Sequence, residues 1–164
     1  MMRGTGTKFA ILACCFLALA ACSKKNTPNL ENETGPGIGG LSPGSKDEFS
    51  QSIGDRVFFQ VDQTTLTPEA EDTLRRQAAW LQKYQNVAVQ VEGHADERGT
   101  REYNISLSAR RATATREFLI AQGIPGNRIS SIAFGKERPV ALCDAEECWS
   151  QNRRAVTVIT GGTN

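Results

Sequence analysis

The chain's only histidine stands in a stretch rich in charged side chains, GHADERGTREYNISLSARRA, at positions 93–112. His94, Asp96 and Glu97 offer a base and two carboxylates within four residues, which are the side-chain types of general acid–base catalysis. Two consecutive arginines close the same stretch. It therefore supports two kinds of chemistry: hydrolysis, or a clamp that holds a charged ligand.

The catalytic interpretation also needs a nucleophile, for which Ser106 or Cys148 could be proposed. One histidine cannot bind a metal ion in the usual way and also act as a base. Cys148 has a second cysteine close by as a disulfide partner. We expect His94 to be a strand-end residue satisfied by local hydrogen bonds, and a hydrolase that uses it is the alternative.

The clamp interpretation explains more residues. Ser108 is typical of a helix N-cap, which would put Arg110 and Arg111 in the first turn, where cations oppose the helix dipole. A ligand carboxylate would relieve that opposition by binding the guanidinium fork and the free backbone N–H groups. Asp96 brings the opposite charge to the same place, so the pair complements a zwitterion, unless Asp96 and Arg111 simply pair with each other.

The elements that must position these side chains follow from periodicity and turn residues. Alternating or β-branched runs predict four strands, and helical spacing between capping and stopping residues predicts two helices. The strands are expected at 57–61, 87–92, 128–134 and 155–160, and the helices at 68–84 and from Ser108 to Gly123. The order β-α-β-α-β-β predicts an α+β sandwich with two main helices packed on one mixed sheet.

Residues 1–21 have the pattern of an export signal. Two basic residues precede the apolar run FAILACCFLALAA, which is too short for a permanent membrane span. The run ends in Leu-Ala-Ala-Cys and resembles the lipobox of bacterial lipoproteins, which implies cleavage before Cys22 and lipidation of that cysteine. An ordinary signal peptide is the alternative. Ser23 implies, by the same resemblance, the outer rather than the inner membrane.

The segment 22–48 is expected to be a lipidated cysteine followed by a flexible tether. It is rich in Gly, Pro, Asn and Ser and has too few apolar side chains to offset chain entropy. Residues 49–164 are then the folded domain. Removal of 1–21 takes away two basic residues and changes the net charge from +1 to −1. Neither value favours nucleic acid as a partner.

The five cysteines divide by position. Cys14 and Cys15 leave with the signal, and Cys22 takes the lipid. Cys143 and Cys148 are left, and an even pair in an oxidising compartment normally forms a disulfide. We expect them to close a short surface loop. A metal site is not expected, because no third cysteine or nearby histidine completes it.

A set of motifs across the chain resembles the OmpA-like domain family, and within it the peptidoglycan-associated lipoproteins of Gram-negative bacteria. The resemblance covers about residues 54–160. The motifs are GHADERGT at 93–100, EYN at 102–104, RRA at 110–112, GKE at 135–137 and NRRAV at 152–156.

The resemblance implies a domain that binds peptidoglycan without a covalent bond, through the free end of meso-diaminopimelate in the stem peptide. It puts the family's ligand aspartate on Asp96 and its ligand arginine on Arg111. A further aspartate falls on Asp62, and Arg98 and Leu107 line the same groove.

The resemblance also implies where the protein works and with what. It implies an outer-membrane protein whose domain faces the periplasm and tethers that membrane to the wall. The periplasmic β-propeller protein of the Tol system would be a second partner, in envelope integrity and cell division. No cofactor and no enzyme activity are expected, and a wall-remodelling hydrolase that uses His94 is the alternative.

Gln60 and Val61 depart from the glycine and phenylalanine that are usual in the family at these positions. Residues 152–154 are expected to be structural or to lie at the groove rim.

Overall fold

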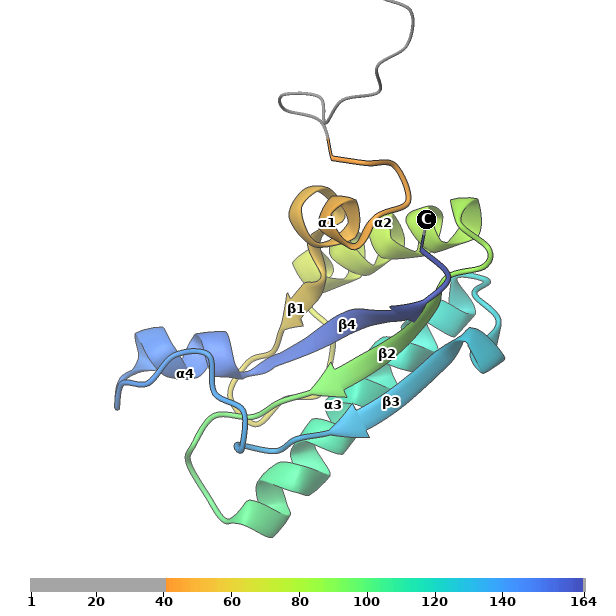
Figure 1. The fold of residues 1–164 in the computed structure, drawn as a ribbon. Coiled ribbons are helices and arrows are strands. Elements are labelled where there is room, and N and C mark those ends of the chain that lie inside the picture. Colours follow the sequence, from red (N-terminus) through yellow and green to blue (C-terminus); the bar gives the residue numbers. More distant parts are fainter. Residues whose placement is uncertain (1–40, 164) are drawn as a thin grey trace, which may run out of the picture. The chain divides into compact units, whose positions relative to one another are not determined.

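The computed structural model describes residues 41–163 (Figure 1). The expected signal segment, Cys22 and the tether up to residue 40 lie outside this range. The described chain is already folded before residue 49, because Ser45 caps the helical turn α1 (Lys46–Glu48). A π-helical turn, η1 (Phe49–Gly54), follows and buries Phe49 in the core. The last residues of the segment expected to be a tether therefore belong to the folded domain.

Four strands form one mixed sheet in the order β1-β4-β2-β3. Strand β4 is antiparallel to both β1 and β2, whereas β2 and β3 are parallel. The α+β prediction is confirmed, and the four strands and the two main helices follow one another in the expected order. The strands are β1 (Arg56–Phe58), β2 (Ala88–Gly93), β3 (Ile129–Ala133) and β4 (Arg154–Gly161).

The two main helices, α2 (Pro68–Lys83) and α3 (Arg101–Ala121), cover the same face of the sheet (Figure 1). The start of α2 is as predicted, because the Thr67 hydroxyl accepts a hydrogen bond from the backbone N–H of Ala70. Burial of apolar side chains between the helices and the sheet is the main driving force for this arrangement. The core includes Val57, Leu74, Leu81, Val89, Val91, Leu119 and Ile129.

The start of α3 is not where the sequence predicted it. Thr100, not Ser108, is the N-cap, and its hydroxyl accepts from the backbone N–H of Tyr103 at 3.2 Å. Ser108 lies buried within the helix, where its hydroxyl accepts from the backbone N–H of Gly135 at 2.9 Å. A serine with a tertiary partner is indistinguishable in the sequence from a capping serine.

This correction moves two arginines. Arg110 and Arg111 lie in the middle of α3 rather than in its first turn, so the helix dipole gives no reason for an anion beside them. The two side chains also differ in their exposure to solvent, because Arg111 is fully buried and Arg110 is exposed.

The first strand is shorter than predicted and ends at Phe58. Phe59 still donates its backbone N–H to the oxygen of Arg153, but the chain then turns, and Gln63 N–H bonds to the Gln60 oxygen. Asp62 has a left-handed backbone, with φ of 58°. The apolar run therefore continues into a loop instead of a strand.

A short helix before β4, α4 (Glu146–Asn152), was not predicted. The disulfide between Cys143 and Cys148 is confirmed and ties this helix to the preceding loop, with Cα atoms 5.5 Å apart. Within residues 41–163, no helix is long and apolar enough to cross a membrane.

Candidate functional site

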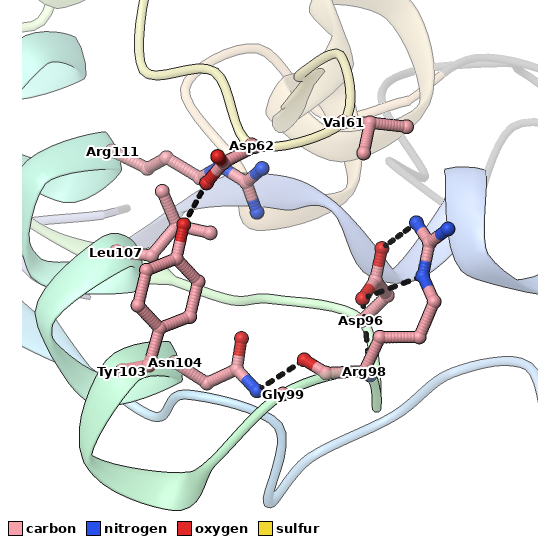
Figure 2. Close-up of a pocket in the computed structure, with 9 residues that line it drawn as sticks. All are labelled: Val61, Asp62, Asp96, Arg98, Gly99, Tyr103, Asn104, Leu107 and Arg111. Atoms are coloured by element: carbon pink, nitrogen blue, oxygen red, sulfur yellow. Dashed lines mark hydrogen bonds and ion pairs between the residues drawn. The ribbon is translucent and has the colours of Figure 1, made fainter.

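All five side chains that the resemblance put at the ligand site line one pocket of about 300 Å³ (Figure 2). Three segments meet there: the loop after β1, the loop after β2 and the first half of α3. The pocket lining is Val61, Asp62, Asp96, Arg98, Gly99, Tyr103, Asn104, Leu107 and Arg111.

Arg111 lies at the base of this site and binds backbone oxygens. Its Nε donates to Gln63 at 2.9 Å, Nη1 to His94 at 2.9 Å and Nη2 to Gln60 at 3.1 Å. The guanidinium also stacks on Phe59, 5.2 Å from the ring centre. Three of the five N–H groups of an arginine are thereby used, and two are left for another acceptor.

The charge of Arg111 has no carboxylate bound to it among residues 41–163, although its side chain is fully buried. Burial lowers the pKa of Arg111 to about 10, so the group is still a cation at neutral pH. A buried charge is costly unless it is paired. The arrangement therefore favours an anion that enters the pocket.

Asp96 is paired, but not with Arg111. Its carboxylate accepts from Arg98 Nη2 at 2.6 Å and from Arg153 Nη1 at 3.2 Å (Figure 2 draws the Arg98 contact). Burial alone would raise the pKa of Asp96, but the hydrogen bonds from Arg98 and Arg153 outweigh it and hold the pKa below its ordinary value. The simple Asp96–Arg111 ion pair, the alternative to a ligand clamp, is thus not formed.

Asp62 carries the second carboxylate of the pocket. It accepts a hydrogen bond from the Tyr103 hydroxyl, which joins the loop after β1 to α3 across the pocket (Figure 2). No cation is bound to Asp62 among the residues that the structure describes. Of the two acids, Asp62 is therefore the one with room for a ligand cation.

Four lining residues were not predicted as site residues: Val61, Gly99, Tyr103 and Asn104. Asn104 is buried and donates its amide N–H to the backbone oxygen of Arg98 at 2.8 Å, which fixes the loop after β2. Tyr103 and Asn104 belong to the EYN motif that carried the resemblance, so a signal for them existed. Helical spacing supplies another, because Tyr103, Leu107 and Arg111 recur every four residues on one face.

Arg153 is closer to the site than its expected rim position suggested. It is buried, pairs with Asp96 on one side, and binds Glu146 and the backbone oxygen of Phe59 on the other. Arg153 therefore pairs with Asp96 while Glu146 and the Phe59 oxygen hold its guanidinium in place.

His94 does not line the pocket. Its ring is buried against Phe134, with ring centres 5.5 Å apart. The prediction that local hydrogen bonds satisfy this side chain was wrong for Nδ1, which has no hydrogen-bond partner within the described chain. Burial, followed by the positive charges of Arg154 and Arg138, lowers the pKa of His94 to about 4. The imidazole is neutral at pH 7 and is not part of the pocket lining, so the geometry does not favour the hydrolase alternative.

Metal chemistry has no support in the described range either. Among residues 41–163, no three His, Cys, Asp or Glu side chains gather as a metal site would require. The pocket instead combines two carboxylates, two guanidinium groups and an apolar wall that includes Leu107. Such a set can bind a ligand with both a cationic and an anionic end.

Fold and pocket together define a small α+β domain that presents a charged groove to a ligand, and comparisons with known proteins agree. The model of the OmpA family matches residues 58–153. The chain is 58% identical over 146 residues to the peptidoglycan-associated lipoprotein of Rhizobium meliloti, covering 88% of this chain and 83% of that protein. It is 37% identical over 161 residues to that of Pseudomonas aeruginosa, covering 90% and 93%.

Solved structures give the same result. The crystal structure of the peptidoglycan-associated lipoprotein from Burkholderia pseudomallei superposes with a TM-score of 0.66 at 33% identity, over 70% of this chain and 98% of that one. The C-terminal domain of Helicobacter pylori MotB shares the fold, with a TM-score of 0.61 at 24% identity, over 65% and 84%. The chain belongs to the OmpA family, and within it to the peptidoglycan-associated lipoproteins.

Proposed function

We propose that this protein is an outer-membrane lipoprotein that binds peptidoglycan without a covalent bond and so tethers the membrane to the wall. The observation that carries the proposal is Arg111, a fully buried cation that has no carboxylate partner in the described chain and lines a pocket with two acids. The names of relatives at 53–58% identity support it, since each is called a peptidoglycan-associated lipoprotein.

The ligand would be the free end of meso-diaminopimelate in the stem peptide. Its carboxylate would take the two unused N–H groups of Arg111, and its ammonium would bind Asp62 and share Asp96 with the two arginines there. The methylene chain would lie along Leu107. Each hydrogen bond to a charged group contributes about 1.5–3 kcal/mol, so one domain binds with modest affinity.

The rest of the chain would serve as membrane anchor and tether. Cys22 would carry the lipid, with residues 1–21 removed and the following segment acting as the tether. At roughly 5–6 Å times the square root of ~20 residues, such a tether spans about 25 Å on average. Many anchored copies that face one polymer gain by effective concentration, which offsets the modest affinity of each.

The domain would act by binding alone and would have no catalytic role. By family resemblance the second partner would be the periplasmic β-propeller protein of the Tol system. Binding to the wall and to the Tol protein would then both contribute to envelope integrity. A pull-down with the Tol protein, with and without sacculi, tests this part separately.

The ligand assignment is tested by titration of the mature chain, residues 22–164 in detergent, with two stem peptides. One ends in free meso-diaminopimelate, and the other ends in lysine, which lacks the second carboxylate. Because the lysine peptide leaves the Arg111 cation unpaired, it should bind at least about tenfold more weakly. Equal affinities would contradict the proposed ligand, and no binding of the chain to purified sacculi would contradict wall binding altogether.

A further inference from the structure

Helix α4 contacts the ligand pocket from outside through Trp149. The Trp149 ring lies under the guanidinium of Arg98, with Cζ 4.2 Å from the ring centre. Its indole Nε1 donates to Glu97 Oε1 at 2.9 Å. One side chain of α4 thus holds two consecutive residues of the loop after β2, and the second of them is bound to Asp96.

The other arginine on Asp96 also depends on α4. Glu146, in the first turn of α4, binds the guanidinium of Arg153, whose Nη1 lies 3.2 Å from Asp96 Oδ2. Both cations that pair with Asp96 are therefore held in place by side chains of one short helix. The charged groups around Asp96 are Arg98 from its own loop, Arg153 next to α4 and Arg111 from α3, with Glu146 and Glu97 behind them.

Helix α4 has little stability of its own. It has seven residues, and its N-cap, Ala145, offers no side-chain hydrogen bond. Isolated helices of this length are unstable in water, so α4 depends on tertiary links. Two of these links join α4 to the preceding loop: the buried Asn152 amide bonds to the backbone of Val140 and Ala141, and the disulfide joins Cys148, the neighbour of Trp149, to Cys143.

We propose that Trp149 is a positioning residue of the ligand site, which holds Arg98 against Asp96, and that the Cys143–Cys148 disulfide keeps Trp149 in place. The Arg98 side chain is 40% exposed and has many rotamers, so it needs a second contact to stay on one carboxylate. The indole ring is that contact, through a cation–π interaction. The effect on ligand affinity rests on the proposed function, whereas the positioning itself exists without a ligand.

The positioning is tested on the free, full mature chain by NMR titration of the Asp96 carboxyl group. Trp149→Ala should raise the pKa of Asp96 toward its ordinary value, because the hydrogen bonds from Arg98 that lower it are then less often formed. Trp149→Phe, which keeps an aromatic face, should restore most of the lowering. Trp80→Phe, a matched change in the core, should leave the pKa as in the wild type. An unchanged Asp96 pKa in folded Trp149→Ala overturns the inference.

The consequence for binding is tested with the diaminopimelate stem peptide and a thermodynamic cycle. Trp149→Ala should weaken binding by about two- to fivefold in the wild-type background. In an Arg98→Ala background it should cause no further loss, because Trp149 acts through Arg98. A loss of the same size in both backgrounds overturns the positioning role and indicates a general structural effect.

The disulfide is tested by reduction. Treatment with dithiothreitol should raise the Asp96 pKa and weaken peptide binding as Trp149→Ala does. The double variant Cys143→Ser/Cys148→Ser should already show the raised Asp96 pKa and the weakened peptide binding. Dithiothreitol should change neither of them further. An unchanged pKa and affinity after complete reduction overturns the role of the disulfide. If the Asp96 pKa responds as expected but the wild type binds no stem peptide, the proposed function fails and the positioning stands.

Discussion

Arg111 donates a hydrogen bond through Nη1 to the backbone oxygen of His94, at 2.9 Å. The bond joins the middle of α3 to the point where the chain leaves β2 for the loop that carries Asp96. Two further bonds, to the oxygens of Gln60 and Gln63, hold the loop that carries Asp62. One buried guanidinium therefore connects the two acid-bearing loops, and at this residue ligand binding and stability depend on the same atoms.

Substitution at Arg111 should impair both properties. Arg111→Lys keeps the charge but cannot reach three carbonyl oxygens and a ligand carboxylate together, so sacculus binding should fall at least about tenfold. The free energy of unfolding should fall by about 2–4 kcal/mol, because buried carbonyl groups lose their donors. Arg110→Ala is the matched control, since this neighbour is exposed and, within residues 41–163, its side chain bonds only to Ser106. Sedimentation with sacculi and urea unfolding measure the two effects, and wild-type binding by Arg111→Lys would contradict the clamp.

Asp62 should be the main partner of the ligand ammonium. Asp62→Asn removes the charge at little change in volume and should weaken binding of the diaminopimelate peptide by about tenfold or more. Tyr103→Phe only removes the hydroxyl that orients Asp62, so its effect should be smaller. Calorimetry with a peptide whose terminal ammonium is acetylated is the control, because Asp62→Asn should then cost nothing further. An equal loss with both peptides would show that Asp62 does not contact the ammonium.

His94 should make stability depend on pH in a defined window. Its pKa is about 4 in the folded chain and about 6.5 in the unfolded one, so the unfolded chain binds more protons between these values. Stability from this group is complete above pH 6.5 and is lost as the pH falls to about 4, by about 2–4 kcal/mol. His94→Phe keeps an aromatic ring against Phe134 and should lose this part of the pH dependence. Urea unfolding of the wild type and His94→Phe at pH 7.5 and 4.5 measures the loss of stability. An equal loss in both proteins would refute the role of His94.

Gly93 should tolerate no side chain. A Cβ atom there would lie 1.9 Å from the backbone oxygen of Ser108 in α3. Gly93→Ala should therefore destabilise the fold by at least about 3 kcal/mol, because neither backbone can move without separating the helix from the sheet. Gly161→Ala, also at a strand end, meets no atom within 4 Å and should stay within about 0.5 kcal/mol of the wild type. Thermal unfolding of both variants measures the two changes in stability, and equal stability of Gly93→Ala and Gly161→Ala would contradict the prediction.

Much of the fold could be predicted because it depends on neighbours in the chain. Thr67 and Pro68 start α2 as capping rules require, and alternation of Val89 and Val91 with polar residues indicated β2. The disulfide could be predicted because the signal pattern and the lipobox account for the other three cysteines and leave one pair. These features have their physical cause within a few residues, so the sequence displays it directly.

The predictions that failed concern residues whose role is set from a distance. Ser108 is typical of an N-cap, but it bonds to Gly135, 27 residues away. The run after Phe58 is typical of a strand, but the Phe59 oxygen accepts a hydrogen bond from Arg153 and the Gln60 oxygen accepts one from Arg111. Helix α4 is too short and too poorly capped to be visible in a pattern, and it is stabilised by a cross-link and by Asn152.

The sequence by itself determined the order of the four strands and the two main helices, the pairing of the cysteines and, through the motifs, which five side chains would share a pocket. Only the tertiary structure decided their partners: Asp96 binds Arg153, 57 residues away, and Arg111 binds the oxygen of Gln63, 48 residues away. Local patterns carry no information across such separations, because the contacts form only after burial of the core has compensated the entropy of closing those loops.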